Sequence, residues 1–444
     1  MGRKRGRTCR KRGRKRAFTP EVMGRRTVNI SHEMQYVQLR KWLKENGCID
    51  LHLVPADFPD TGRGLMTTKA LQPGDTIIAL PEKCLLTTQT VHRSYLGKYI
   101  ERWKPRLSPL QVLCTFLVAE RHFGRTSPWK PYIDVLPKAY TCPGYLAEEV
   151  LRLLPEALLG KAEVQRRDIR ELTLSSEGFF HSLQPLFAES VEGIFTSDAL
   201  RWAWCSVNTR TVYMERLQSE YFSREPDVYA LAPYLDLLNH SPTVQVTAGF
   251  NQESKCYEIR TLTKCRRYQQ AFICYGPHDN QRLLLEYGFF AANNPHSVIY
   301  VEKDVLRTHL LQKDKELNGK LSFLQDRGFL ENLTFGFEGP SWRLLAALKV
   351  LCLGPDNYSQ WKKVLIGLPD SVGNERNSLD LASSLCSHLM NENQKVLQKI
   401  YKLMSNRTEL LEQLDLVAKL REEERKILQA SLVILQRLRN TTTS

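Results

Sequence analysis

The chain alternates between strand-like and helix-like sequence patterns, and this alternation constrains its fold more than any other feature. Residues 50–100 are rich in short strands and turns, with a compact apolar strand at Thr76–Leu80. Residues 109–205 read as helices, alternating strands return over 244–275, and helices then continue almost to the end. This order predicts an α+β fold in which a β-rich domain is split by a helical insertion and followed by a helical lobe.

Helix boundary signals define the insertion. Ser108-Pro109 pairs a capping hydroxyl with a proline at the first helical position, and Gly124 gives a stop. Further apolar helical stretches span Phe179–Ile194 and Leu200–Val207. These signals indicate an insertion over about residues 100–210.

The last third of the chain has the composition of a helical lobe. Ser341–Leu353 is bounded by proline and glycine, and Val396–Leu438 carries Leu, Ile or Val every three or four residues, which predicts one long amphipathic stretch. That pattern is not strictly seven-fold, so packing within a lobe over residues 301–440 is favoured over a dimer zipper. We expect a monomer.

Most of the net charge of +15 lies at the N-terminus. The first 26 of the 444 residues hold twelve Lys or Arg and one acid, a net +11. Such a run cannot bury apolar area, so residues 1–30 are predicted to be a disordered tail, with order beginning near Ser31. A nuclear-import signal that binds an import receptor, weak nucleic-acid contact and a solvated tail all remain open. The expected location is nucleus and cytosol.

The cysteines indicate reduced thiols. The eleven are scattered and contain no Cys-x-x-Cys pair, so neither a disulfide framework nor a structural zinc is expected. The sequence also shows no apolar run long enough for a bilayer and no secretory signal, so no membrane association is predicted.

Four short motifs carry the functional information. Asp236–Ser241 reads Asp-Leu-Leu-Asn-His-Ser, Ile273–Gly276 reads Ile-Cys-Tyr-Gly, Glu286–Phe289 reads Glu-Tyr-Gly-Phe, and Thr61–Leu65 reads Thr-Gly-Arg-Gly-Leu. Each alone has a plain structural interpretation, such as an Asx turn or a core tyrosine. Their order and separations are much harder to produce by chance.

Together the motifs resemble the SET-domain protein methyltransferases. The similar branch has a helical insertion and a C-terminal lobe like the substrate-binding domain of the Rubisco large-subunit methyltransferase. The resemblance covers residues 50–438. It implies a SET domain over 31–277. The following segment, residues 278–300, forms the end of the SET core and threads beneath the preceding strand as a pseudoknot. An all-α substrate-binding lobe is implied over 301–440.

The resemblance implies a protein-lysine N-methyltransferase that uses S-adenosyl-L-methionine. Tyr275 matches the active-site tyrosine, whose phenol oxygen orients the methyl group and the attacking nitrogen. Asn239 matches a contact to the amino-acid end of the cofactor, and the main chain of His240 matches a contact to its adenine. His240 is therefore not expected to be a base or a metal ligand. The remaining cofactor residues implied are Gly62, Arg63, Gly64 and, near the cofactor carboxylate, Arg210.

The same resemblance implies a narrow channel for the target side chain. Tyr287 and Phe289 match its walls, and Asp236 matches a position that faces it in some relatives. An apolar channel favours a neutral amine, because desolvation lowers the pKa of lysine.

Two departures from the family pattern affect substrate choice. Residues 266–270, before the strand of Tyr275, read Arg-Arg-Tyr-Gln-Gln where the family has a Gly-Glu or Asp-Glu pair, and Asp279 replaces a frequent serine. The substrate is expected to be a protein, histones among the candidates, docked on the lobe. Two alternatives are a histidine N-methyltransferase and a non-catalytic SET-fold protein that binds chromatin or RNA.

Overall fold

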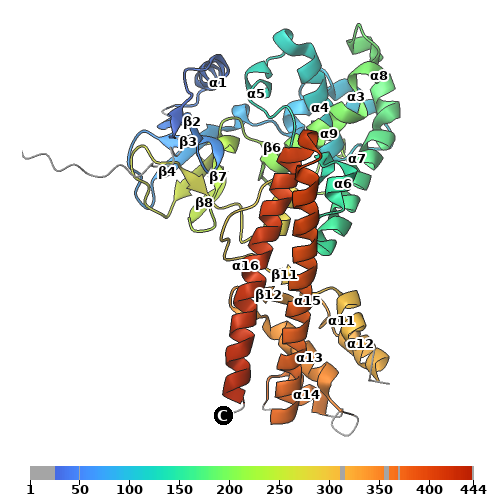
Figure 1. The fold of residues 1–444 in the computed structure, drawn as a ribbon. Coiled ribbons are helices and arrows are strands. Elements are labelled where there is room, and N and C mark those ends of the chain that lie inside the picture. The colour runs from blue at the N-terminus through green and yellow to red at the C-terminus, as the bar shows by residue number, and fades with distance from the viewer. Residues whose placement is uncertain (1–25, 50, 311–315, 355–359, 369–370, 443–444) are drawn as a thin grey trace, which may run out of the picture.

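The computed structural model describes residues 26–49, 51–310, 316–354, 360–368 and 371–442. Most of the predicted basic tail, residues 1–25, lies outside the described residues. The chain forms a β-rich and helical upper half and a helical lower lobe, and two long helices run along both (Figure 1). The predicted α+β fold class is confirmed.

The first sheet is antiparallel and begins earlier in the chain than predicted. Val28 pairs with Asp57 and Asn29 with Ala56, so regular structure starts before Ser31 and includes the end of the predicted tail. A short helix then leads into the hairpin that holds the glycine turn. These elements are β1 (Val28–Asn29), α1 (Met34–Glu45), β2 (Leu53–Phe58) and β3 (Gly62–Thr67).

The second sheet joins strands from both sides of the insertion. Its order is β4-β9-β8, with both pairings antiparallel, so the helical insertion leaves the β-rich domain continuous. Two smaller pairs complete the domain: antiparallel β5 with β6, and parallel β7 with β10. The strands are β4 (Thr76–Pro81), β5 (Thr211–Tyr213), β6 (Tyr229–Leu231), β7 (Asn239–His240), β8 (Val246–Asn251), β9 (Cys256–Thr261) and β10 (Phe272–Ile273).

The insertion is helical, as predicted, but one predicted helix is interrupted. The α4 cap is a capping box between Ser108 and Gln111. The stretch Phe179–Ile194 is not one helix. It contains the end of α7, a 3-10 turn at Gln184–Leu186 and α8, because Pro185 follows the end of α7 and the Gln184 side chain bonds to three backbone groups. The helices are α2 (Thr88–His92), α3 (Gly97–Arg102), α4 (Pro109–Phe123), α5 (Lys130–Ile133), α6 (Glu148–Leu151), α7 (Glu156–Ser182), α8 (Val191–Ile194) and α9 (Ser197–Arg210).

The segment after the insertion crosses the β-rich domain and is pinned by buried amides. Ala271 N–H donates to the Leu65 carbonyl of β3 at 2.8 Å, and β10 then lies parallel to β7. Helix α10 (Asn280–Tyr287) follows. The Asn280 amide exchanges two hydrogen bonds with the backbone of Ala291, at 2.9 and 3.1 Å. Both the oxygen and the nitrogen of the Asn280 side-chain amide thereby have hydrogen-bond partners inside the core.

The C-terminal lobe is helical except for a three-stranded sheet that the sequence did not predict. The predicted single stretch Val396–Leu438 is also broken, because the chain turns at residues 405–410 and its apolar faces pack against each other as an antiparallel hairpin. The elements are β11 (Ile299–Tyr300), α11 (Lys303–Leu310), α12 (Leu317–Asp326), β12 (Thr334–Gly336), β13 (Gly339–Pro340), α13 (Trp342–Cys352), α14 (Trp361–Leu365), α15 (Val372–Met404) and α16 (Leu411–Thr442).

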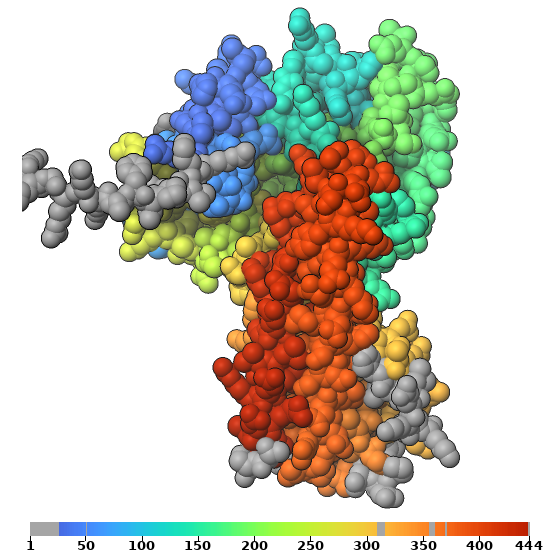
Figure 2. Space-filling view, in the orientation of Figure 1, coloured from blue at the N-terminus to red at the C-terminus, as the bar shows by residue number. Residues whose placement is uncertain are grey.

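Three apolar clusters form the core. One fills the β-rich domain and insertion, and a second fills the lobe. The third joins them, because Leu151 and Leu158 of the insertion pack with Leu284 of α10 and with Ile400 and Leu414 of the hairpin. The hairpin therefore lies against both halves, and its surface is continuous from one to the other (Figure 2).

The described part of the chain contains no helix long and apolar enough to cross a membrane. In the same residues, no group of three or more His, Cys, Asp or Glu could hold a metal ion. The ten described cysteines are all free thiols.

Candidate active site

The predicted glycine turn lies at the start of β3, and its two glycines differ in what they require. Gly62 has φ +66° and open space where a Cβ would be, so its requirement is conformational. A Cβ on Gly64 would lie 2.5 Å from Nε2 of Gln270 and 2.8 Å from Nδ2 of Asn239. Glycine is thus required at position 64 because the side-chain amides of Gln270 and Asn239 pack where a Cβ would lie.

Arg63 ties this turn to two distant segments. Its guanidinium donates to the Val135 carbonyl, just after α5, at 2.6 Å. Its own carbonyl accepts from Nδ2 of Asn239 at 3.0 Å. The Arg63 side chain therefore fixes the insertion against the β2–β3 hairpin, and the Arg63 backbone, which is the part predicted to face the cofactor, fixes β7.

Asn239 and His240 form β7, and the imidazole of His240 positions the chain at Tyr275. Nδ1 of His240 accepts from the Tyr275 backbone N–H at 3.1 Å. Burial lowers the pKa of His240 to about 4, and His278 and His296 act in the same direction. The ring is therefore neutral near pH 7, with its proton on Nε2, and a general-base role is not favoured.

Tyr275 follows β10 and is held at both ends. Its phenol O–H donates to the Leu238 carbonyl at 2.7 Å, which leaves lone pairs on the phenol oxygen available to accept. Burial raises the pKa of the phenol above its ordinary value, although Arg210 opposes this. Gly276 has φ +141°, and a Cβ there would lie 2.6 Å from Nε2 of His278. Tyr275 is thus a neutral phenol in a fixed position.

An aromatic cluster surrounds Tyr275, and we define it as the rings of His240, Tyr275, His278, Tyr287 and Phe289. The ring centre of Tyr275 lies 4.8 Å from that of Tyr287, 5.2 Å from that of His240 and 6.1 Å from that of Phe289. His278 stacks on Tyr287 at 6.1 Å. Residues predicted to wall the channel and to do the chemistry therefore meet in one place.

A buried polar group lies beside this cluster. Asp236 accepts from the Tyr132 hydroxyl at 3.0 Å, and Nη1 of Arg210 lies 4.0 Å from the same carboxylate oxygen and 2.9 Å from the Asp236 carbonyl. Burial raises the pKa of Asp236, and Arg210 and the Tyr132 hydrogen bond oppose it. Arg210 and Asp236 are therefore partners of each other.

Sequence reasoning missed two residues of this site. Tyr132 lies 104 positions from Asp236, and Gln270 accepts from the Thr61 hydroxyl 209 positions away at 2.8 Å. Local spacing gives no sign of the Tyr132 contact. For Gln270 there was a signal, because residues 266–270 depart from the family pattern directly before the strand of Tyr275.

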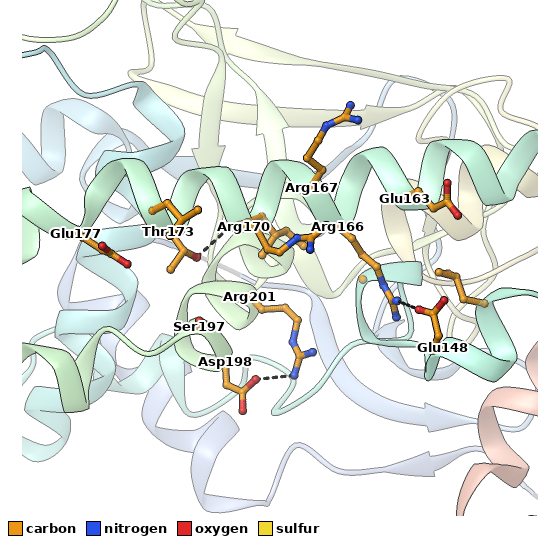
Figure 3. A pocket seen from close by; sticks show the side chains of 14 residues that line it. Glu148, Glu163, Arg166, Arg167, Arg170, Thr173, Glu177, Ser197, Asp198 and Arg201 are labelled. Carbon is orange, nitrogen blue, oxygen red and sulfur yellow. Dashed lines mark hydrogen bonds and ion pairs between the residues drawn. The ribbon is translucent and has the colours of Figure 1, made fainter.

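A broad hollow of about 890 Å³ lies elsewhere, along α7 (Figure 3). Its arginines are largely engaged: Arg166 pairs with Glu148 and Arg201 with Asp198, both at 2.8 Å. None of the predicted site residues lines it. Because opposite charges are balanced along it, we interpret it as a solvated surface and not as the reaction site.

Comparison with known proteins identifies two regions. A model of the SET domain matches residues 62–276, and a model described as Rubisco LSMT substrate-binding matches residues 312–428. Over 443 residues the chain is 54% identical to SET domain-containing protein 4 of Homo sapiens, and the match covers 100% of each protein.

More distant relatives have different target side chains. The chain is 25% identical to a ribosomal lysine N-methyltransferase of Schizosaccharomyces pombe, covering 81% of this chain and 88% of that protein. It is 27% identical to the actin-histidine N-methyltransferase of Xenopus tropicalis, covering 73% and 55%. The fold is also that of Rubisco LSMT bound to AdoMet, with a TM-score of 0.58, 21% identity and coverage of 92% and 93%.

Proposed function

The chain belongs to the SET-domain methyltransferases, which use S-adenosyl-L-methionine, and we propose that it methylates lysine side chains of proteins. The observation that carries this proposal is the fixed, neutral phenol of Tyr275 inside the aromatic cluster. A water-poor aromatic wall with one oriented oxygen suits transfer to an amine, which needs alignment and little covalent help.

The described residues fit the cofactor. Buried atoms without a hydrogen-bond partner in the described structure include Nε of Arg210 and Nε2 of His240, both donors. Arg210 is suited to the cofactor carboxylate, because a guanidinium pairs strongly with that group. Gly62, Arg63 and Gly64, with Asn239 and His240, would present backbone groups to the remainder of the molecule.

The bound cofactor supplies an electrophilic methyl group, and the protein must supply geometry. The Tyr275 oxygen can accept from polarised C–H groups and from the amine, because its own proton is donated to Leu238. Tyr287 and Phe289 exclude water around the amine. Loss of water favours the neutral amine, whose lone pair makes the new bond. Asp236 is proposed to face the substrate side of this channel.

A histidine target is the second candidate. It is supported by the similarity to an actin-histidine N-methyltransferase, whereas the similarity to a ribosomal lysine N-methyltransferase supports the first. A non-catalytic protein that binds chromatin or RNA is the third. It is less well supported, because the neutral Tyr275 and its aromatic cluster are in place.

The test is methyl transfer from labelled cofactor to histones and to a nuclear extract. Tyr275→Phe should lower the rate at least about a hundredfold, because the oriented oxygen is lost. Tyr268→Phe is the matched control, since this tyrosine is 58% exposed on the adjacent loop. Equal labelling by wild type and Tyr275→Phe would refute the assigned role. Mass spectrometry of the product distinguishes lysine from histidine.

We also propose how the chain finds its substrates. The lobe docks a protein, histones among the candidates, and the basic tail serves nuclear import, with the enzyme present in nucleus and cytosol. The tail is outside the described residues, so only its charge supports this. Deletion of residues 2–25 should move a fluorescent fusion from nucleus to cytosol while methyl transfer in vitro is unchanged.

A further inference from the structure

A second cavity, of about 400 Å³, lies where the insertion, α10 and the lobe meet. Its wall is formed by the first turn of α7, the first turn of α10, β11, the start of α11 and parts of α15 and α16, two helices that lie side by side (Figure 1). None of the predicted site residues lines it. We call it the junction cavity.

Two carboxylates from different units line the junction cavity, and neither forms an ion pair with a described residue. Glu156 begins α7, and Glu302 precedes α11. Burial raises the pKa of Glu302, and the proximity of Glu156 raises it further, while Lys161 opposes. Neither carboxylate forms an ion pair with a described residue, and Nζ of Lys161 lies over the Tyr300 ring, 5.3 Å from its centre.

Two buried amides in the wall also lack donors. Gln281 is 4% exposed and Asn393 is 3% exposed, and both side chains donate to Glu424, at 3.1 and 3.4 Å. Oε1 of Gln281 and Oδ1 of Asn393 have no hydrogen-bond partner among the described residues. An unpaired buried acceptor costs about 1–3 kcal/mol. Both amide oxygens therefore lack a donor among the described residues.

Arg421, which lines the cavity, is already engaged. Nη1 of Arg421 lies 3.3 Å from Glu424, and its Nε and Nη2 donate to the Leu153 carbonyl at 3.1 and 2.9 Å. Glu392 pairs with Lys395 at 2.7 Å. Lys161 and Lys303 lower the pKa of Glu302, but neither forms an ion pair with Glu302 or Glu156 among the described residues.

We propose that the junction cavity binds an organic cation, a protonated alkylamine or a guanidinium, between Glu156 and Glu302. Such a group offers the donors and the charge that the wall lacks. A metal ion is a poor fit, because no cluster of three metal-binding side chains occurs among the described residues. A basic side chain of another protein and a free polyamine share this chemistry.

Binding is measured by calorimetry on the full chain, with spermidine and with the peptide acetyl-Gly-Lys-Gly-amide as separate probes. Glu302→Gln and, from the other unit, Glu156→Gln should each weaken binding about tenfold. Glu331→Gln, an exposed glutamate of the lobe away from the cavity, should leave binding unchanged. Spermidine alone would identify a polyamine site, and binding of the peptide would identify a site for basic protein segments.

Three results would overturn the proposal: binding of neither probe, equal binding by wild type and both cavity variants, or an equal loss in Glu331→Gln. Glu156 is exposed, so its variant stays informative even if Glu302→Gln fails to fold. No methyl transfer enters the measurement. Failure here therefore leaves the proposed methyltransferase activity untouched.

Discussion

The catalytic half and the C-terminal lobe are held together in different ways. Asn239, His240 and Tyr275 lie on or beside the two-residue strands β7 and β10, and side-chain hydrogen bonds such as Asn239 to Arg63 fix them. The lobe is built on helices of 33 and 32 residues that pack through apolar faces. Two-residue strands form too few backbone hydrogen bonds to fix the site residues, so buried side-chain hydrogen bonds fix them in the catalytic half.

The largest effect should come from the lobe. Leu385→Ala removes a fully buried side chain of α15 and should lower the free energy of unfolding by about 2–5 kcal/mol. Val433→Ala, at a position 48% exposed, is the control and should change it little. Chemical denaturation measures both. Equal stability of the two variants would show that apolar packing does not dominate the lobe.

The next effect is a pH dependence that belongs to the catalytic half. The pKa of His240 is about 4 in the folded chain against 6.5 for an ordinary histidine. Its neutral form therefore contributes stability in full above pH 6.5, and this is lost as the pH falls toward 4, by up to about 3 kcal/mol. Unfolding free energies measured across this range should fall less in His240→Gln than in wild type.

Two controls sharpen this test. His32→Gln changes an exposed histidine and should leave the wild-type profile intact. Leu385→Ala should shift the whole curve without changing its slope, because no titrating group is altered. Identical slopes for wild type and His240→Gln would contradict the role given to this ring.

A third, smaller effect should join stability to activity. Gly64→Ala places a Cβ against the Gln270 and Asn239 amides and should cost about 1–3 kcal/mol, together with methyl transfer. Gly249→Ala has no atom within 4 Å of the new Cβ and serves as the control. Thermal unfolding and labelled methyl transfer are measured on the same preparations. Full activity in Gly64→Ala would show that the two amides can move aside.

The smallest effect should come from the insertion. Tyr132→Phe removes the donor to buried Asp236 and should cost about 1–2 kcal/mol, with a further rise in the Asp236 pKa. Tyr213→Phe, at a position 68% exposed, should be neutral. Urea denaturation distinguishes them. If both variants match wild type, the Asp236 carboxylate is stabilised without the insertion.

The comparison also explains what the sequence could predict. The helical lobe follows from periodicity. The turn before Leu411 does not, because the apolar spacing continues on both sides of Ser405 and Asn406 and so indicates one helix. Tyr275, Tyr287 and Phe289 could be found only as motifs of a family. The Tyr132 contact joins segments remote in sequence, and the local pattern carries no record of it. Gln270 also contacts a remote residue, but it lies in the stretch 266–270 that departs from the family pattern.

The α15–α16 hairpin has a consequence for shortened forms of the chain. Its inner end completes the apolar cluster that contains Leu151, Leu154 and Leu158 of the insertion. A protein truncated before Leu411 would therefore expose the apolar surface of the insertion that α16 covers in the full chain. Such a product should aggregate or be degraded, so a freely soluble, active SET fragment would need polar replacements at these leucines.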